Sequence, residues 1–205
     1  MPLASRVTPF GALVAHPSKA ATLTGNRGII HDLATRTLLT RRWSNKAWIA
    51  CTCDYKGRNR SPIWTKNVWT ELFFLDEATA LAAGHRPCFT CRRPDALRFR
   101  DHWALGNHTA IPSAPEMDLT LHAERLDGKH KRLHPVPQTL PDGTMLAASD
   151  RAYLIANGHT WLWDFSGYTR TDLPGTIDGM LTPPSITATL AAGYKAALHP
   201  SVLTA

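Results

Sequence analysis

Four cysteines in two close pairs constrain this chain more than any other feature of its sequence. Cys51 and Cys53 are separated by one residue, and Cys88 and Cys91 by two. Thiols paired this closely, in a chain that lacks the charged start and apolar run of a secretory signal, are typical of metal binding rather than of disulfides. The Cys-x-x-Cys spacing is that of a zinc knuckle, in which two thiolates at a turn bind one ion. The sequence therefore predicts a structural zinc site.

Two ligand sets fit this predicted zinc site. All four cysteines would complete a tetrahedral site with bonds of about 2.3 Å. Alternatively, three cysteines and one histidine would bind the ion, and His85, three residues before Cys88, is the nearest histidine. Four buried thiols without any metal are the remaining alternative.

The positive charge of the chain is concentrated around the cysteines. The formal net charge of the whole chain is +7. Residues 36–100 hold 13 basic and 5 acidic residues, a net charge of +8, whereas the rest holds 10 basic and 11 acidic residues, a net charge of −1. A basic segment attracts phosphate groups through counterion release, so we expect a nucleic acid, most readily DNA, as the partner. A basic surface that only aids solubility is the alternative.

Local signals around the second cysteine pair predict a compact unit. Residues 69–75 are rich in aromatic and branched side chains and predict a short buried strand. Asp76 fits a helix N-cap, residues 77–83 favour a helix, and Gly84 fits the left-handed position just after its end. A second helix is expected over residues 96–103, beyond the cysteine turn.

The stretch FFLDEATALAAGHRPCFTCRRPDALRF resembles the zinc-binding, methylphosphotriester-repair domain of the Ada family of DNA repair proteins. The resemblance extends over about residues 46–103. It implies zinc bound by four cysteines, contact with the DNA backbone, and a thiolate of the first pair that accepts a methyl group from phosphate. Cys51 falls on that methyl-accepting position. The chain departs from the family in its first pair, because the family has Cys-x-x-x-Cys and Tyr55 stands where its second cysteine would be.

Outside that stretch, histidines and carboxylates suggest a second chemistry. His31 and Asp32 are adjacent, and an imidazole beside a carboxylate could act as a general base or bind metal. The alternative is a turn capped by Asp32. His122 and Glu124 begin a stretch with further histidines at positions 130 and 134 and several cations. That stretch fits a site that handles phosphate, a loop that contacts the nucleic-acid backbone, or ordinary surface.

The residues expected to contact nucleic acid are Arg58, Arg60, Arg86, Arg92, Arg93, Arg125 and Lys129. The residues expected to be catalytic are His31, Asp32, His122 and Glu124.

The expected fold is α+β, with a small zinc-stabilised α/β unit and a C-terminal antiparallel sheet. The expected parts are an N-terminal segment over residues 1–45, the Ada-like domain over 46–103, a linker over 104–118, and a β-rich segment with a terminal helix over 119–205. No apolar run approaches the roughly 20 residues of a membrane span, so we expect a cytoplasmic protein, associated with the nucleoid if it is bacterial.

Three functions are consistent with these features. The first is an enzyme, such as a nuclease, glycosylase or lesion-repair enzyme, that acts on DNA with a His/carboxylate site beside structural zinc. The second is a DNA-binding or damage-sensing module without catalysis. The third is a methyl-accepting repair protein that uses Cys51.

Overall fold

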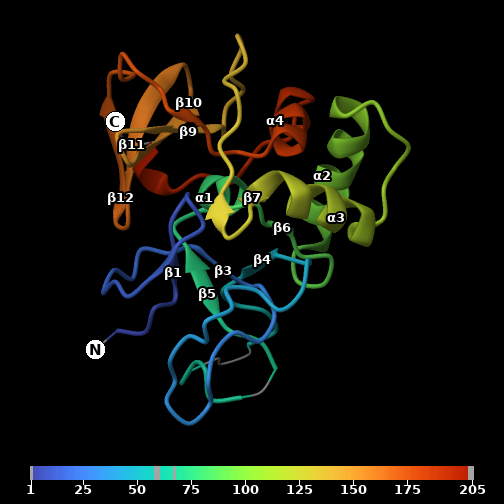
Figure 1. The fold of residues 1–205 in the computed structure, drawn as a ribbon. Helices are drawn as coiled ribbons and strands as arrows, with labels where there is room; N and C mark the ends of the chain where they lie inside the picture. The colour runs from blue at the N-terminus through green and yellow to red at the C-terminus, as the bar shows by residue number, and fades with distance from the viewer. Residues whose placement is uncertain (1, 58–60, 67, 203–205) are drawn as a thin grey trace.

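The three-dimensional arrangement was taken from a computed structural model, which describes residues 2–57, 61–66 and 68–202. Within these residues the chain forms four α-helices, one short 3-10 helix and three sheets, which confirms the α+β class. In Figure 1 the sheet of the C-terminal region and the helices lie above the N-terminal sheet. None of the described helices has both the length and the apolar character needed to cross a bilayer.

The N-terminal sheet brings together strands that are far apart in the sequence. In spatial order it contains β2 (Leu13–Val14), β1 (Arg6–Val7), β5 (Leu72–Phe74), β3 (Leu23–Asn26), β4 (Ile49–Thr52) and β6 (Arg86–Pro87). Strand β3 pairs antiparallel with both β4 and β5, whereas β4 and β6 run parallel. This sheet carries Cys51 and leads directly into the second cysteine pair.

The C-terminal sheet is antiparallel, as expected. Its spatial order is β12 (Gly167–Thr171), β11 (His159–Asp164), β10 (Arg151–Ala156), β9 (Met145–Ala148) and β13 (Gly179–Met180). Asn157 and Gly158, a residue pair that in a sequence is a strong hairpin signal, join β10 to β11. Both have positive φ, as the type I′ turn of a two-residue hairpin requires. A further pair of short strands is formed by β7 (Leu126–Asp127) and β8 (His130–Lys131).

The helices are α1 (Glu77–Ala82), α2 (Arg93–Gly106), α3 (Ala114–Arg125) and α4 (Pro184–Ala191), followed by η1 (Pro200–Val202). The predicted cap of α1 is confirmed, because the Asp76 carboxylate accepts a hydrogen bond from the Thr79 backbone N–H at 2.9 Å. Gly84 has a φ of +82°, as expected just after the helix. Residues 104–118, expected to be a linker, hold the end of α2, a loop and the start of α3.

The short helix α1 lies at the centre of the molecule. All six of its residues are buried, and they contribute to three separate apolar clusters. Ala78 and Ala82 pack with the C-terminal sheet, Leu81 packs among α2, α3 and α4, and Ala80 packs against the N-terminal sheet. The small alanine side chains allow three layers to approach one helix. The position of the cysteine turn that follows is therefore fixed from three sides.

The predicted strand at residues 69–75 is shorter than expected. Only Leu72–Phe74 pairs as β5. The preceding Thr70 contacts the loop after β3 instead: its N–H donates to the Gly28 carbonyl at 3.0 Å, and its hydroxyl accepts from the Ile30 N–H at 2.8 Å. These contacts occupy groups that an extended ladder would use.

Candidate metal centre

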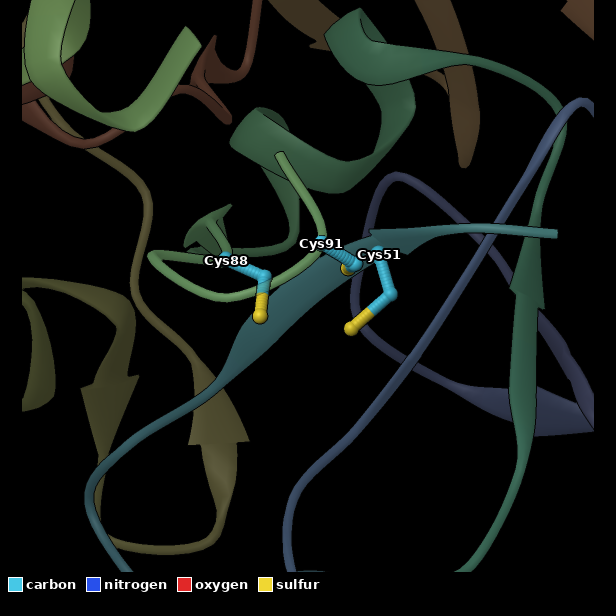
Figure 2. Close-up of side chains that lie close together, drawn as sticks. All are labelled: Cys51, Cys88 and Cys91. Atoms are coloured by element: carbon cyan, nitrogen blue, oxygen red, sulfur yellow. The ribbon is translucent and has the colours of Figure 1, made fainter. Parts of the chain in front are cut away.

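Three of the four cysteines converge at one edge of the N-terminal sheet. Cys51, Cys88 and Cys91 have sulfur atoms that all lie within 4.8 Å of one another. Figure 2 shows Cys51 on β4 and the other two on the turn between β6 and α2. Sulfur atoms bound to one tetrahedral zinc lie about 3.8 Å apart, given bonds of about 2.3 Å. The cluster is therefore compatible with one zinc ion after a small inward movement of the side chains.

The parallel pairing of β4 with β6 explains why the two cysteine pairs meet. Ile49 lies opposite Arg86, and Ala50 lies opposite Pro87. One residue further along both segments brings Cys51 level with Cys88, and the Cys88 N–H donates to the Ala50 carbonyl at 3.0 Å. The metal site thus depends on a pairing between segments that lie more than thirty residues apart in the sequence.

The thiols of the cluster influence one another even without a metal. A hydrogen bond between the Cys51 thiol and the Cys88 sulfur raises the pKa of Cys51 and lowers the pKa of Cys88 to about 4. Burial raises the pKa of Cys91. The Thr90 N–H also donates to the Cys88 sulfur, at 3.4 Å. Negative charge is therefore concentrated on Cys88, and zinc binding would release the remaining thiol protons.

A cavity of about 250 Å³ opens beside the three sulfur atoms. Besides the cysteines, its walls include Ile49 and the aromatic side chains of Tyr55 and Trp69. Gly25 forms another part of the wall, and a Cβ atom there would lie 2.1 Å from the Ile49 carbonyl oxygen, so this position has no room for a side chain. The cluster therefore faces a largely apolar space that a small group could enter.

The structure places neither candidate for the fourth ligand within the cluster. Cys53 does not join the cluster: β4 ends at Thr52, the chain bends, and the exposed Cys53 thiol donates to the Thr22 carbonyl at 3.4 Å. His85, the alternative ligand, is also outside the cluster. Its ring is fully buried, and its Nε2 accepts a hydrogen bond from the Arg27 Nε at 3.2 Å. Among the described residues, only three protein ligands converge.

Three arginines expected to contact phosphate are buried and have other partners. Arg86 forms a two-bond ion pair with Asp118 of α3, at 2.8 and 2.7 Å. Arg92 pairs with Glu77 at 2.8 Å and also with Asp95. The third, Arg125, is 1% exposed and donates to backbone carbonyls. Arg86 and Arg92 therefore hold the fold together beneath the surface, whereas Arg125 also lines a basic cavity.

The other residues expected to bind nucleic acid have different positions. Arg93 at the start of α2 and Lys129 between β7 and β8 are exposed. Arg58 and Arg60 lie outside the described residues. The basic segment retains further exposed cations that were not singled out, namely Arg36, Arg41, Arg42, Lys46, Lys56, Lys66 and Arg98. Contact of any of them with a nucleic acid remains a prediction.

The expected catalytic residues do not form one cluster in the described structure. His31 is buried against Trp64, and its Nδ1 lies 2.7 Å from the Thr70 hydroxyl. Burial lowers the pKa of His31. Asp32 accepts hydrogen bonds from the N–H and hydroxyl of Thr35, at 2.8 and 2.9 Å, and thus caps its own turn.

His122 and Glu124 are likewise engaged in separate local contacts. The Nδ1 of His122 lies 3.1 Å from an Arg125 nitrogen, and Glu124 accepts from the Ser185 hydroxyl at 2.6 Å. Burial lowers the pKa of His122 and raises the pKa of Glu124. The expected catalytic residues therefore share no site in the described structure, and a hydrolytic role for them remains a prediction.

Sequence reasoning missed several residues that line the cavities. Tyr55 and Trp69 beside the cysteines had no recognisable spacing, because they come from different irregular segments. Arg27 and Trp48, which line a second cavity with several cations, were also missed. Trp48 directly precedes β4, the strand that carries Cys51.

Comparisons with protein-family models, with curated proteins and with solved structures found no match for this chain. The three-cysteine cluster and its cavity are therefore the main indications of its function.

Proposed function

We propose that this chain is a zinc-dependent DNA repair protein that binds DNA and accepts an alkyl group from a phosphotriester on Cys51. The observation that carries the proposal is the placement of three thiols on the wall of a cavity of about 250 Å³. A site closed by four protein ligands has a structural role, whereas three protein ligands leave one position for exchange. The resemblance of residues 46–103 to the Ada family supports the choice of DNA as substrate.

The residues fit the metal that the resemblance implies. Three sulfur donors that converge from a strand and a knuckle turn suit zinc, which favours thiolate ligands. Cys51, Cys88 and Cys91 would hold the ion. When bound, zinc would supply a positive charge that keeps the thiolates deprotonated at neutral pH.

The cavity beside the thiols suits a neutral, partly apolar substrate. A methyl phosphotriester carries no charge at its reacting phosphate, unlike the phosphodiesters around it. Ile49, Tyr55 and Trp69 give the cavity apolar walls that favour such a group over a charged one. The exposed cations of the basic segment would contact the flanking phosphodiesters.

The proposed reaction transfers one methyl group. The Cys51 thiolate attacks the methyl carbon, a sulfur–carbon bond forms, and the carbon–oxygen bond of the ester breaks. The electron pair of that bond stays on the phosphate oxygen, which becomes the anionic oxygen of a phosphodiester. Cys51 becomes a neutral thioether, so each molecule reacts once unless another process removes the methyl group.

The test is to incubate the zinc-loaded protein with duplex DNA containing a single methyl phosphotriester. We expect a mass increase of one methyl group, located on Cys51 by peptide mass spectrometry. Cys53→Ser, two residues away and outside the cluster, is the matched control and should be methylated as the wild type is.

Three outcomes separate the candidate functions. Methylation of Cys51 supports the proposal. DNA binding without methylation would overturn it in favour of a damage-sensing or binding module, and nicks or abasic sites that form in plasmid would favour an enzyme with a His/carboxylate site.

A further inference from the structure

A second and larger cavity, of about 410 Å³, is lined by positive charge. Its walls carry five cationic side chains, and none of its described lining residues is a carboxylate. The cations are Arg27, Arg42, Arg125, Lys129 and Lys131. This cavity shares no described lining residue with the cysteine cavity. Asn26 and Ile49 line the cysteine cavity, whereas the adjacent Arg27 and Trp48 line the basic one.

Two of these arginines are almost fully buried without an acidic partner. Arg27 and Arg125 are each 1% exposed. Arg27 donates to the Gly11 carbonyl at 2.9 Å and to His85, and its second terminal nitrogen, Nη2, has no partner. Arg125 donates to the carbonyls of Gly84 and Lys46, and its Nε has no partner. Each guanidinium group therefore has one buried N–H donor without a hydrogen-bond partner in the protein.

Both guanidinium groups lie against the same aromatic ring. The central carbon of Arg27 is 3.8 Å from the Trp48 ring centroid, and that of Arg125 is 4.0 Å away. Contact with an aromatic ring stabilises a cation by less than burial of the ion costs. Trp48 orients the two charges but does not neutralise them.

The positive charges in this cavity destabilise one another. Burial, together with the charges of Arg27 and Arg125, lowers the pKa of Lys131 to about 7. The nearest carboxylates are engaged elsewhere, since Asp118 pairs with Arg86 and Glu124 accepts from Ser185. These two carboxylates still act on Arg125 and Lys131 but form no ion pair with them. A buried cluster of cations with so little counter-charge is best explained by an anionic ligand.

The mouth of the cavity adds an aromatic surface. Trp43 is half-buried, lines the cavity, and lies 6.1 Å from Trp48 between ring centroids. Trp48 also holds a buried indole N–H without a partner. A tryptophan face beside a phosphate-binding group is the arrangement that binds a nucleotide, because the base stacks while the phosphate is held by cations.

We propose that this cavity binds a nucleoside phosphate, with the phosphate on Arg27, Arg125 and Lys131 and the base against Trp43. The ligand is either a free nucleotide or one nucleotide of a nucleic-acid strand. The proposal is independent of alkyl transfer, because it uses none of the cysteines.

The test is isothermal titration calorimetry of the full chain with dAMP, deoxyadenosine and inorganic phosphate. We expect dAMP to bind most tightly, phosphate to bind more weakly and to compete with dAMP, and deoxyadenosine not to bind measurably. Arg27→Met should weaken dAMP binding by at least about tenfold, which is the effect of losing a hydrogen bond to a charged group. Because Arg27 is buried, Trp43→Leu at the half-buried mouth provides a second variant, which should weaken dAMP but not phosphate.

Arg151→Gln is the matched control, since Arg151 is an exposed arginine at the start of β10 in the other sheet. It should bind dAMP as the wild type does. Equal binding of deoxyadenosine and dAMP, no binding of dAMP, or unchanged affinity in both Arg27→Met and Trp43→Leu would overturn the proposal.

Two further arms complete the experiment. A single-stranded oligonucleotide that competes with dAMP identifies the ligand as a nucleotide within a strand, whereas failure to compete identifies a free nucleotide. Cys51→Ser should retain dAMP binding, so that failure of alkyl transfer and failure of this site can be told apart.

Discussion

Replacement of Cys88 by serine is expected to remove the metal from the protein. Cys88 contributes one of the three thiols in the described cluster that could hold a metal, and its pKa is lowered whereas those of the other two are raised. Loss of a partner outside the ligand shell of a metal site already costs about 10–100-fold in affinity, so loss of a ligand should cost more than about 100-fold. Metal analysis of the purified variant, with a competing chelator to measure affinity, gives the result.

The same variant should also be less stable, because metal binding and folding are linked. The turn that holds Cys88 and Cys91 connects β6 to α2 and has the Cys88 carbonyl accepting from the Arg92 N–H at 3.0 Å. Without an ion, this turn loses the metal bonds that would hold it to β4. Cys53→Ser is the control and should keep its metal. Full metal occupancy in Cys88→Ser would contradict the assignment.

Replacement of Asp118 by alanine is expected to lower the free energy of unfolding by about 3–5 kcal/mol, since it leaves the Arg86 charge buried without its partner. The two side chains are 8% and 6% exposed, so little water is available to replace the lost carboxylate. The pair joins α3 to the strand that precedes Cys88. Urea unfolding measures the effect.

A double variant separates the cost of an unpaired charge from the value of the pair itself. Arg86→Met combined with Asp118→Leu removes both charges and should be much less destabilised than Asp118→Ala alone. A loss below about 1 kcal/mol in Asp118→Ala would show that Arg86 reaches solvent or another partner.

Local signals predicted the parts of the fold that depend on neighbouring residues. The Asp76 cap, the Gly84 helix end and the hairpin at Asn157 and Gly158 were all predictable, because each is set by the conformations and hydrogen bonds of a few adjacent residues. The antiparallel C-terminal sheet follows from the same turn chemistry.

Whether each arginine is buried or exposed could not be predicted from local signals. Arg86 and Arg93 belong to the same basic segment, yet one is buried and the other exposed. The difference depends on Asp118, which is 32 residues away from Arg86. A count of charges in the sequence gives the net charge of a segment but not which charges are neutralised inside the fold.

The metal site was predictable in part. The Cys-x-x-Cys pair indicated a knuckle, and the structure brings Cys51 to it through the register of β4 and β6. Cys53 fell outside because β4 ends at Thr52, and the end of a four-residue strand is not encoded in the spacing of two cysteines. The basic cavity depends on segments around residues 27, 48 and 125, so no local pattern marked it.

The proposed metal centre has three cysteine ligands and one position open to the cavity. X-ray absorption spectroscopy at the zinc edge of the zinc-loaded protein tests it most directly, because it counts the sulfur ligands. We predict three sulfur atoms at about 2.3 Å and one lighter ligand, oxygen or nitrogen. Four sulfur ligands would show that Cys53 closes the site and would contradict an open three-cysteine centre, as would a protein that binds no zinc.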